Sequence, residues 1–306
     1  MEAAKVTARE RLTKRKKKFW DGELRGKLLV VAAAIIIMVS TLSITLFLTT
    51  KGLQSFTSGA VGVFDFLTST KWDPTATEPS YGIFPFIFGS LAVTLLAALI
   101  AGPVGIGGAI FMVEIAPSWG RKVLQPIIEL LVGIPSVVYG FIALSVVVPF
   151  IRNTFGGTGY SLLSGVIVLS VMILPTITSI ATDAIASQPG ELRDGAYALG
   201  ATRFQMIRKV LLPAAKPALM TAIVLGMARA FGEALAVQMV IGNVRTMPGS
   251  ILDPSATITS IITLNMGHTT YGSTENNTLW SMGLVLLVIS FIFIMLIRYL
   301  STRRNA

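Results

Sequence analysis

Residues 187–217 read SQPGELRDGAYALGATRFQMIRKVLLPAAKP, a polar stretch between two long apolar runs. Seven charged residues lie within it, whereas the whole chain of 306 residues is 53% hydrophobic and only 13% charged. Such a composition is far more apolar than that of a soluble domain. We therefore expect this stretch to lie outside a membrane that buries most of the remaining chain.

Five charge-free apolar runs flank this stretch, at 28–50, 79–113, 130–151, 153–182 and 276–297, and a sixth run at about 217–242 holds two charges. About 20 apolar residues cross a bilayer as a helix, and open strands would leave backbone groups unpaired in lipid. The sequence thus predicts an all-α, polytopic membrane protein with six transmembrane helices. We place them at about 28–50, 84–106, 127–150, 162–186, 217–242 and 278–299.

Glycine and proline predict irregularities in the second and third spans. Gly102-Pro103 interrupts the second run, so we expect its helix to continue or bend towards Glu114 and Pro117. Gly133-Ile134-Pro135 predicts a bend in the third span. The first run is longer than the apolar core of a signal peptide, which favours an uncleaved first helix.

The positive charges are distributed unevenly between the predicted loops. Ten of the 25 Lys and Arg residues precede residue 28, which is typical of an orientation signal and lipid anchor and argues against a nucleic-acid site. With six spans, 20 of the 25 lie on the side of both termini and of residues 187–217, and 4 lie on the other side. The positive-inside rule makes the first side cytoplasmic.

Arg229 and Glu233 are the two charges within the fifth predicted span. An Arg at the centre of a transmembrane helix costs about 2.5–3.5 kcal/mol on insertion scales, and such groups usually face a pathway or a partner. At positions i and i+4 of one helix the two side chains are expected to share a face, with about 6 Å of rise between their Cα atoms, and two interpretations are open. They form a self-neutralising pair, or Arg229 attracts an anion in a solvated path while Glu233 limits how tightly the anion is held.

Ser136, Tyr139 and Gln238 are weaker candidates for the lining of such a path, because each also suits plain helix packing. With no Cys and a single His, the sequence supports no disulfide, thiol nucleophile or metal site, and we expect no cofactor. Gly195–Thr202 comes close to a phosphate-binding loop, but the Lys is missing and no buried strand precedes it. We therefore do not expect the chain to be an enzyme that hydrolyses ATP.

Asp194-Gly195-Ala196, then Gly200, then Val210-x-Leu212-Pro213 resembles the E-A-A-x3-G-x9-I-x-L-P signature of ABC importer permeases at every spacing. Pro189 can begin one helix, and Thr202 with Gln205 has capping-box spacing for a second. The resemblance implies that this loop couples to a cytoplasmic ATPase, whereas the alternative is a plain surface hairpin. The expected coupling residues are Glu191, Asp194, Gly195, Ala196, Gly200 and Pro213.

Four stretches are similar to PstC-type permeases of phosphate-specific ABC importers: Phe111–Pro117, Glu129–Gly140, Tyr197–Pro213 and Arg229–Asn243. This resemblance implies a type I ABC importer permease fold in a bacterial or archaeal plasma (inner) membrane. It also implies a second homologous permease subunit, a dimer of ATP-binding subunits and an extracytoplasmic phosphate-binding protein as partners. Asp194-Gly195 in place of Glu-Ala departs from the pattern and bears on how the ATPase grips the loop.

The expected organisation has four parts: a basic cytoplasmic tail (1–27), the first helix with an outer loop (28–83), a permease core (84–300) and a second cytoplasmic tail (301–306). The expected function is translocation of inorganic phosphate by a subunit that contacts membrane lipid and no nucleic acid. Two alternatives remain open at this stage. One is the same architecture serving another oxyanion, such as sulfate or molybdate, and the other is an ion-gradient-driven transporter that acts alone.

Overall fold

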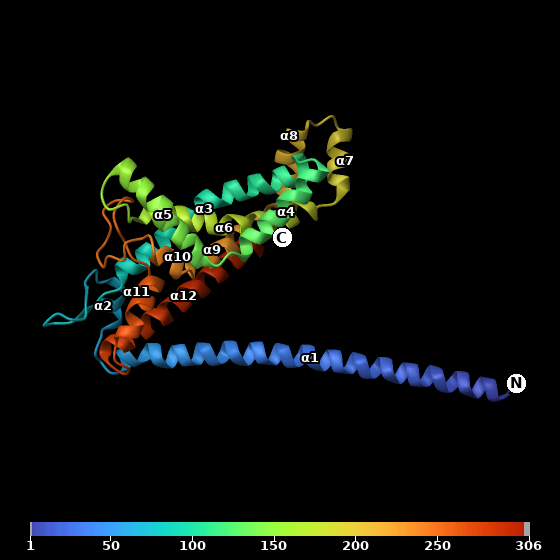
Figure 1. Cartoon of the computed structure of the whole chain (residues 1–306), viewed down its shortest axis with the longest axis horizontal. Helices are drawn as coiled ribbons and strands as arrows, with labels where there is room; N and C mark the ends of the chain where they lie inside the picture. Colours follow the sequence, from blue (N-terminus) through green and yellow to red (C-terminus); the bar gives the residue numbers. More distant parts are fainter. Residues whose placement is uncertain (1, 303–306) are drawn as a thin grey trace. The chain divides into compact units, whose positions relative to one another are not determined.

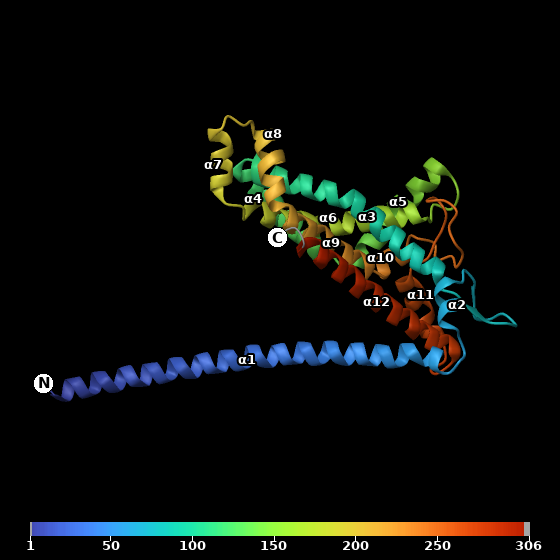
Figure 2. The ribbon, with the colours of Figure 1, turned by 180° about the vertical axis from the view of Figure 1, so that it is seen from behind.

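A computed structural model describes residues 2–302, with side chains from residue 26 to residue 295 (Figures 1 and 2). The chain divides into two compact units, Met1–Lys51 and Gly52–Ala306. The first unit belongs to one continuous helix, α1 (Glu2–Thr57), whose last turns enter the second unit. Residues 303–306 of the predicted C-terminal tail lie outside the described part of the chain.

Within the described residues, six helices are long and apolar enough to cross a membrane, as the sequence predicts. They cover Gly26–Thr57, Phe84–Ile115, Ser136–Phe155, Leu162–Ala186, Arg203–Phe231 and Thr274–Met295. The only strands in the described residues, β1 (Trp72–Asp73) and β2 (Ser80–Tyr81), form a small antiparallel hairpin. The all-α membrane fold is therefore confirmed.

Three helices form the centre of the second unit: α3 (Phe84–Ile110), α6 (Leu162–Ala186) and α9 (Leu212–Phe231). Ile177 on α6 is fully buried between Gly105 on α3 and Gly226 on α9, where a Cβ atom would lie 2.9 Å and 2.7 Å from it. Small residues let helix backbones approach closely in membranes, where packing replaces the hydrophobic effect. The two glycines thus set the spacing of this three-helix core.

The second predicted span continues through Pro103, as expected, and ends in a π-helical turn, η1 (Phe111–Ile115). The third differs from its prediction, because residues 127–150 are not one bent helix. Pro135 holds Ile134 in an extended conformation, and this separates α4 (Ser118–Gly133) from α5 (Ser136–Phe155). Of these two helices, only α5 is long and apolar enough to cross a membrane.

The fifth predicted span, 217–242, also differs. The helix begins earlier, with α8 (Arg203–Met206) and a π-helical turn, η2 (Ile207–Leu211), and it ends with α9 at Phe231. A separate short helix, α10 (Leu235–Gln238), follows after a break at Gly232. Hydropathy alone does not reveal this break, because residues 217–242 form one apolar run in which Arg229 and Glu233 are the only charges.

Four short helices lie at the two ends of the second unit. α7 (Gly190–Ala198) and α8 lie at one end, while α2 (Val63–Thr68) and α11 (Ile258–Asn265) lie at the other (Figures 1 and 2). The α2 end has its own apolar core, in which Trp72 packs edge-on against Phe86. A short 3-10 helix, η3 (Met266–His268), leads to α12 (Thr274–Thr302), which packs along α9.

Candidate functional site

Arg229 lies in the last turn of α9 and is partly buried. Its Nη1 donates to Thr176 Oγ1 on α6 at 2.9 Å, and its Nη2 donates to the Val132 carbonyl at the end of α4 at 3.4 Å. Among the side chains of residues 26–295, no carboxylate oxygen lies within 4.0 Å of this guanidinium. Its charge is therefore held by neutral acceptors.

The C-terminal turn of α4 is the point where two predicted pathway residues meet. Tyr139, in the first turn of α5, donates its hydroxyl to the Leu131 carbonyl at 2.9 Å, beside the carbonyl that Arg229 contacts. Carbonyls of a last helical turn lack helical partners and carry the negative end of the helix dipole. The break at Pro135 exposes these carbonyls, and Arg229 and Tyr139 bind two of them.

Glu233 does not share a helix face with Arg229, so this part of the prediction is wrong. Since α9 ends at Phe231, Glu233 lies in the linker before α10. Its Oε1 accepts a hydrogen bond from the Ala236 backbone N–H at 3.2 Å, and its own carbonyl accepts from Thr259 at 2.8 Å. The carboxylate thus helps to begin α10 and does not neutralise Arg229.

The other two pathway candidates are placed differently. Ser136 begins α5 next to the break, where it is partly buried. Gln238 ends α10, and its side-chain Oε1 is buried without a hydrogen-bond partner, while its carbonyl accepts from Asn243 at 2.7 Å. The structure therefore brings Arg229 and Tyr139 together with the neighbourhood of Ser136, and leaves Gln238 on the separate α10 segment.

Thr176 is the contact that sequence reasoning missed. It follows Pro175 in the middle of α6, fifty-three residues before Arg229, and no local spacing links the two. Only the packing of α6 against α9 brings the hydroxyl to the guanidinium. A polar residue next to a proline inside an apolar helix is the one signal that the sequence offered.

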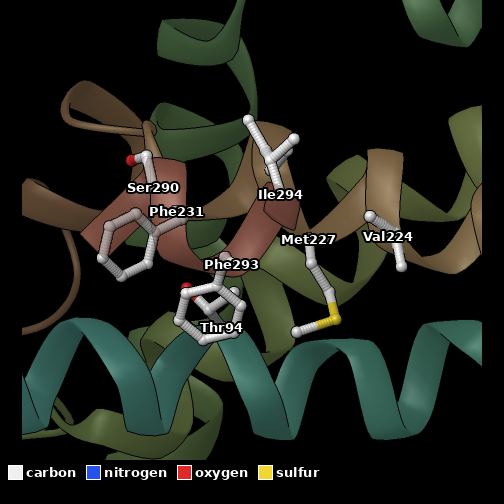
Figure 3. A pocket seen from close by; sticks show the side chains of 8 residues that line it. Thr94, Val224, Met227, Phe231, Ser290, Phe293 and Ile294 are labelled. Carbon is white, nitrogen blue, oxygen red and sulfur yellow. The ribbon is translucent and has the colours of Figure 1, made fainter. Parts of the chain in front are cut away.

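A pocket of about 100 Å³ lies between α3, α9 and α12 (Figure 3). Its lining is almost wholly apolar and comes from Thr94, Val224, Met227, Ala228, Phe231, Ser290, Phe293 and Ile294. Arg229 is not among these residues, because its guanidinium reaches towards α6 and α4. The lining contains no charged residue, and its polar side chains are the hydroxyls of Thr94 and Ser290.

The loop 187–217 forms two helices, as predicted. Pro189 precedes α7, and Thr202 with Gln205 forms a complete capping box at the start of α8. Ala196 is buried against the central core and anchors α7. The other predicted coupling residues are exposed: Glu191, Asp194, Gly195, Gly200 and Pro213.

Gly200 has a φ of +77°, a conformation that side-chain-bearing residues rarely adopt. It allows the chain to turn from α7 into α8, with the Gly200 N–H donating to the Tyr197 carbonyl at 2.9 Å. Around this turn the apolar side chains of Leu199 and Phe204 are 90% and 67% exposed. These two residues, which the motif does not include, give the tip of the loop an apolar surface.

Comparison with known proteins places this chain in a family. Residues 105–306 match the model described as binding-protein-dependent transport system inner membrane component. The chain is 67% identical to the probable ABC transporter permease protein YqgH of Bacillus subtilis, over 98% of this chain and 97% of that protein. It is 34% identical to the phosphate transport system permease protein PstC of Mesorhizobium japonicum, over 90% and 88%.

A solved relative supports the fold at low identity. The chain resembles a bacterial ABC transporter involved in the import of the acidic polysaccharide alginate, with a TM-score of 0.62 and 19% identity over 94% of this chain and 99% of that one. Six membrane-spanning helices, the loop signature and the family match agree with one another. The chain belongs to the binding-protein-dependent transport system inner membrane components, the permease subunits of ABC transporters.

Proposed function

We propose that this permease subunit translocates inorganic phosphate, with Arg229 as the residue that the anion meets within the membrane. The observation that carries the proposal is the guanidinium held only by neutral acceptors, Thr176 Oγ1 and the Val132 carbonyl. A guanidinium has more N–H groups than these two bonds use. A tetrahedral oxyanion offers the charge-assisted, fork-like contacts that Arg prefers.

The second support is the similarity to proteins named as phosphate transport system permeases, at 34% identity over most of both chains. The relative that is 67% identical is named only as a probable ABC transporter permease. Another oxyanion, such as sulfate or molybdate, is therefore the competitor to be measured against phosphate in the same assay.

The partners follow from the same proposal. The exposed loop tip around Leu199 and Gly200 docks on a dimer of ATP-binding subunits, and the α2 end receives an extracytoplasmic binding protein. A second permease subunit completes the path. Both termini and the loop 187–217 lie in the cytoplasm, with 20 of 25 Lys and Arg on that side. ATP is hydrolysed by the partner, because the loop lacks the phosphate-binding Lys.

Reconstitution of the full complex in vesicles tests the proposal through ATP-dependent uptake of radiolabelled phosphate. Hydrogen bonds to a charged group contribute about 1.5–3 kcal/mol, so Arg229→Gln should raise the KM or lower the rate about tenfold or more. Arg229→Lys should retain part of the uptake, because it keeps the charge and loses the fork. The exposed Arg152, at the far end of α5, supplies the matched control Arg152→Gln.

Unchanged uptake in Arg229→Gln would remove Arg229 from the path. Stronger inhibition of uptake by sulfate or molybdate than by unlabelled phosphate would reassign the substrate to that oxyanion. Uptake by the single chain without ATP would instead support the transporter that works alone on an ion gradient.

A further inference from the structure

Arg193 joins three elements at the α7 end of the second unit. Its Nε and Nη2 each lie 2.9 Å from Glu114 Oε1 in the π-helical turn η1. Its Nη1 donates to the Gln188 carbonyl at 3.0 Å, and its Nη2 donates to the Ile185 carbonyl at 3.1 Å. One guanidinium on α7 thus binds the end of α3 and the end of α6 together.

The environment of Arg193 and Glu114 strengthens the ion pair between them. The Glu114 side chain is 9% exposed and the Arg193 side chain 22% exposed, so water screens the pair far less than it screens a surface ion pair. Ile185 lies in the last turn of α6, where unpaired carbonyls and the helix dipole favour a cation. Loss of either charge leaves the other partly buried and uncompensated.

The residue type matches this task. A planar guanidinium donates to a carboxylate and to two carbonyls at the same time, whereas an ammonium is a point donor on a flexible stem. Glu114 lies in a π-helical turn, an irregularity that is frequent at functional sites. Neither residue is part of the loop signature, so spacing alone does not single them out.

We infer that the Arg193–Glu114 pair is the positioning joint that makes α7 move as one body with the adjoining ends of α3 and α6. The inference rests on the proposed coupling of loop 187–217 to an ATPase. From Ile185 back to Thr176, α6 runs for about 13 Å without a proline. A displacement of α7 therefore reaches the hydroxyl that holds Arg229 through one rigid helix.

A pair of spin labels attached to introduced cysteines tests the Arg193–Glu114 joint directly. The chain itself has no Cys, so within it only the two introduced cysteines carry a label. Gly190 on α7 and Gly107 on α3 suit this purpose, since a Cβ at either position meets no heavy atom within 4 Å. Electron–electron double resonance on the assembled complex gives the distance between the labels with and without trapped ATP. We expect the same distance in both states for the otherwise unchanged chain, and an ATP-dependent shift in Arg193→Gln.

Arg121→Gln is the matched control, because Arg121 is an exposed residue at the start of α4. It should leave the distance unaltered. In the same complexes, Arg193→Gln should keep ATP hydrolysis and lose about tenfold or more of the phosphate moved per ATP. Arg193→Lys should restore part of that ratio, which a merely misfolded loop would not show.

Two results would overturn this inference. One is a distance between the labels that changes with ATP in the otherwise unchanged chain, and the other is a distance that does not change with ATP in Arg193→Gln. Failure of the phosphate proposal gives a different pattern. In that case no variant moves phosphate, while the label distances still separate Arg193→Gln from its control.

Discussion

The contact between Gly105 and Ile177 allows a quantitative prediction about the three-helix core. A Cβ at position 105 would lie 2.9 Å from Ile177 Cγ2, 3.2 Å from its Cβ and 3.3 Å from Thr178 Oγ1. Ile177 cannot swing away, because β-branched side chains have one preferred χ1 in a helix and its other branch faces Gly226. Gly105→Ala therefore forces the helices apart.

The magnitude follows from a matched variant on the same helix. At Gly107, two residues further along α3, an added Cβ meets no heavy atom within 4 Å. Gly107→Ala should gain up to about 1 kcal/mol of helix propensity. Gly105→Ala gains the same amount but adds about 1–3 kcal/mol of overpacking, so the two variants should differ by about 1–3 kcal/mol.

Thermal unfolding of both variants in one detergent measures this difference. At about 2–4 °C per kcal/mol for domains of 150–250 residues, the Tm of Gly105→Ala should lie at least about 2 °C below that of Gly107→Ala. Ile177→Ala removes the clashing Cγ2, so in that background the two variants should converge. Equal Tm values for Gly105→Ala and Gly107→Ala in the presence of Ile177 would refute close packing at this site.

Two further predictions concern the ends of the second unit. Thr202→Ala removes the capping box of α8 and should lower local stability by about 0.5–2 kcal/mol. The loss should be seen as faster amide hydrogen exchange at Gln205. The control Thr221→Ala, at an exposed position in the middle of α9, should leave this exchange rate unchanged. Burial, and secondarily the charge of Glu275, raises the pKa of Tyr81 above its ordinary value of 10.0. Since the unfolded chain then loses this proton first, the free energy of unfolding should fall as pH rises above about 10. The fall should be smaller in Tyr81→Phe, and equal slopes in both proteins would contradict the assignment.

Much of the structure of loop 187–217 was predictable because its signals are local. Pro189, the Thr202–Gln205 pair and the small residues around Gly200 act on their own backbone within a few positions, and the structure has α7, the capping box and the turn where those residues stand. The exposed apolar tip at Leu199 and Phe204 was not predicted, because the sequence alone does not show whether an apolar loop residue is buried or exposed.

The membrane spans show the same division. Hydropathy depends only on composition along the chain, so the sequence by itself determined the six spans, the all-α class and the approximate places of all spans but the third and the fifth. It also placed a costly Arg229 inside the membrane. Hydropathy did not predict the break after Phe231, because the run 217–242 is apolar apart from Arg229 and Glu233. Since the helix ends there, Arg229 and Glu233 do not share a helix face.

Only the tertiary structure decided what Arg229 and Arg193 touch. Thr176, Val132 and Glu114 are separated from these two arginines by 53, 97 and 79 residues. Helix packing brings these residues together, and their spacing in the sequence does not predict the contacts. The physical reason is that a partly buried guanidinium binds the acceptors that the packed helices leave unpaired, and those acceptors are fixed by where the helices end and cross.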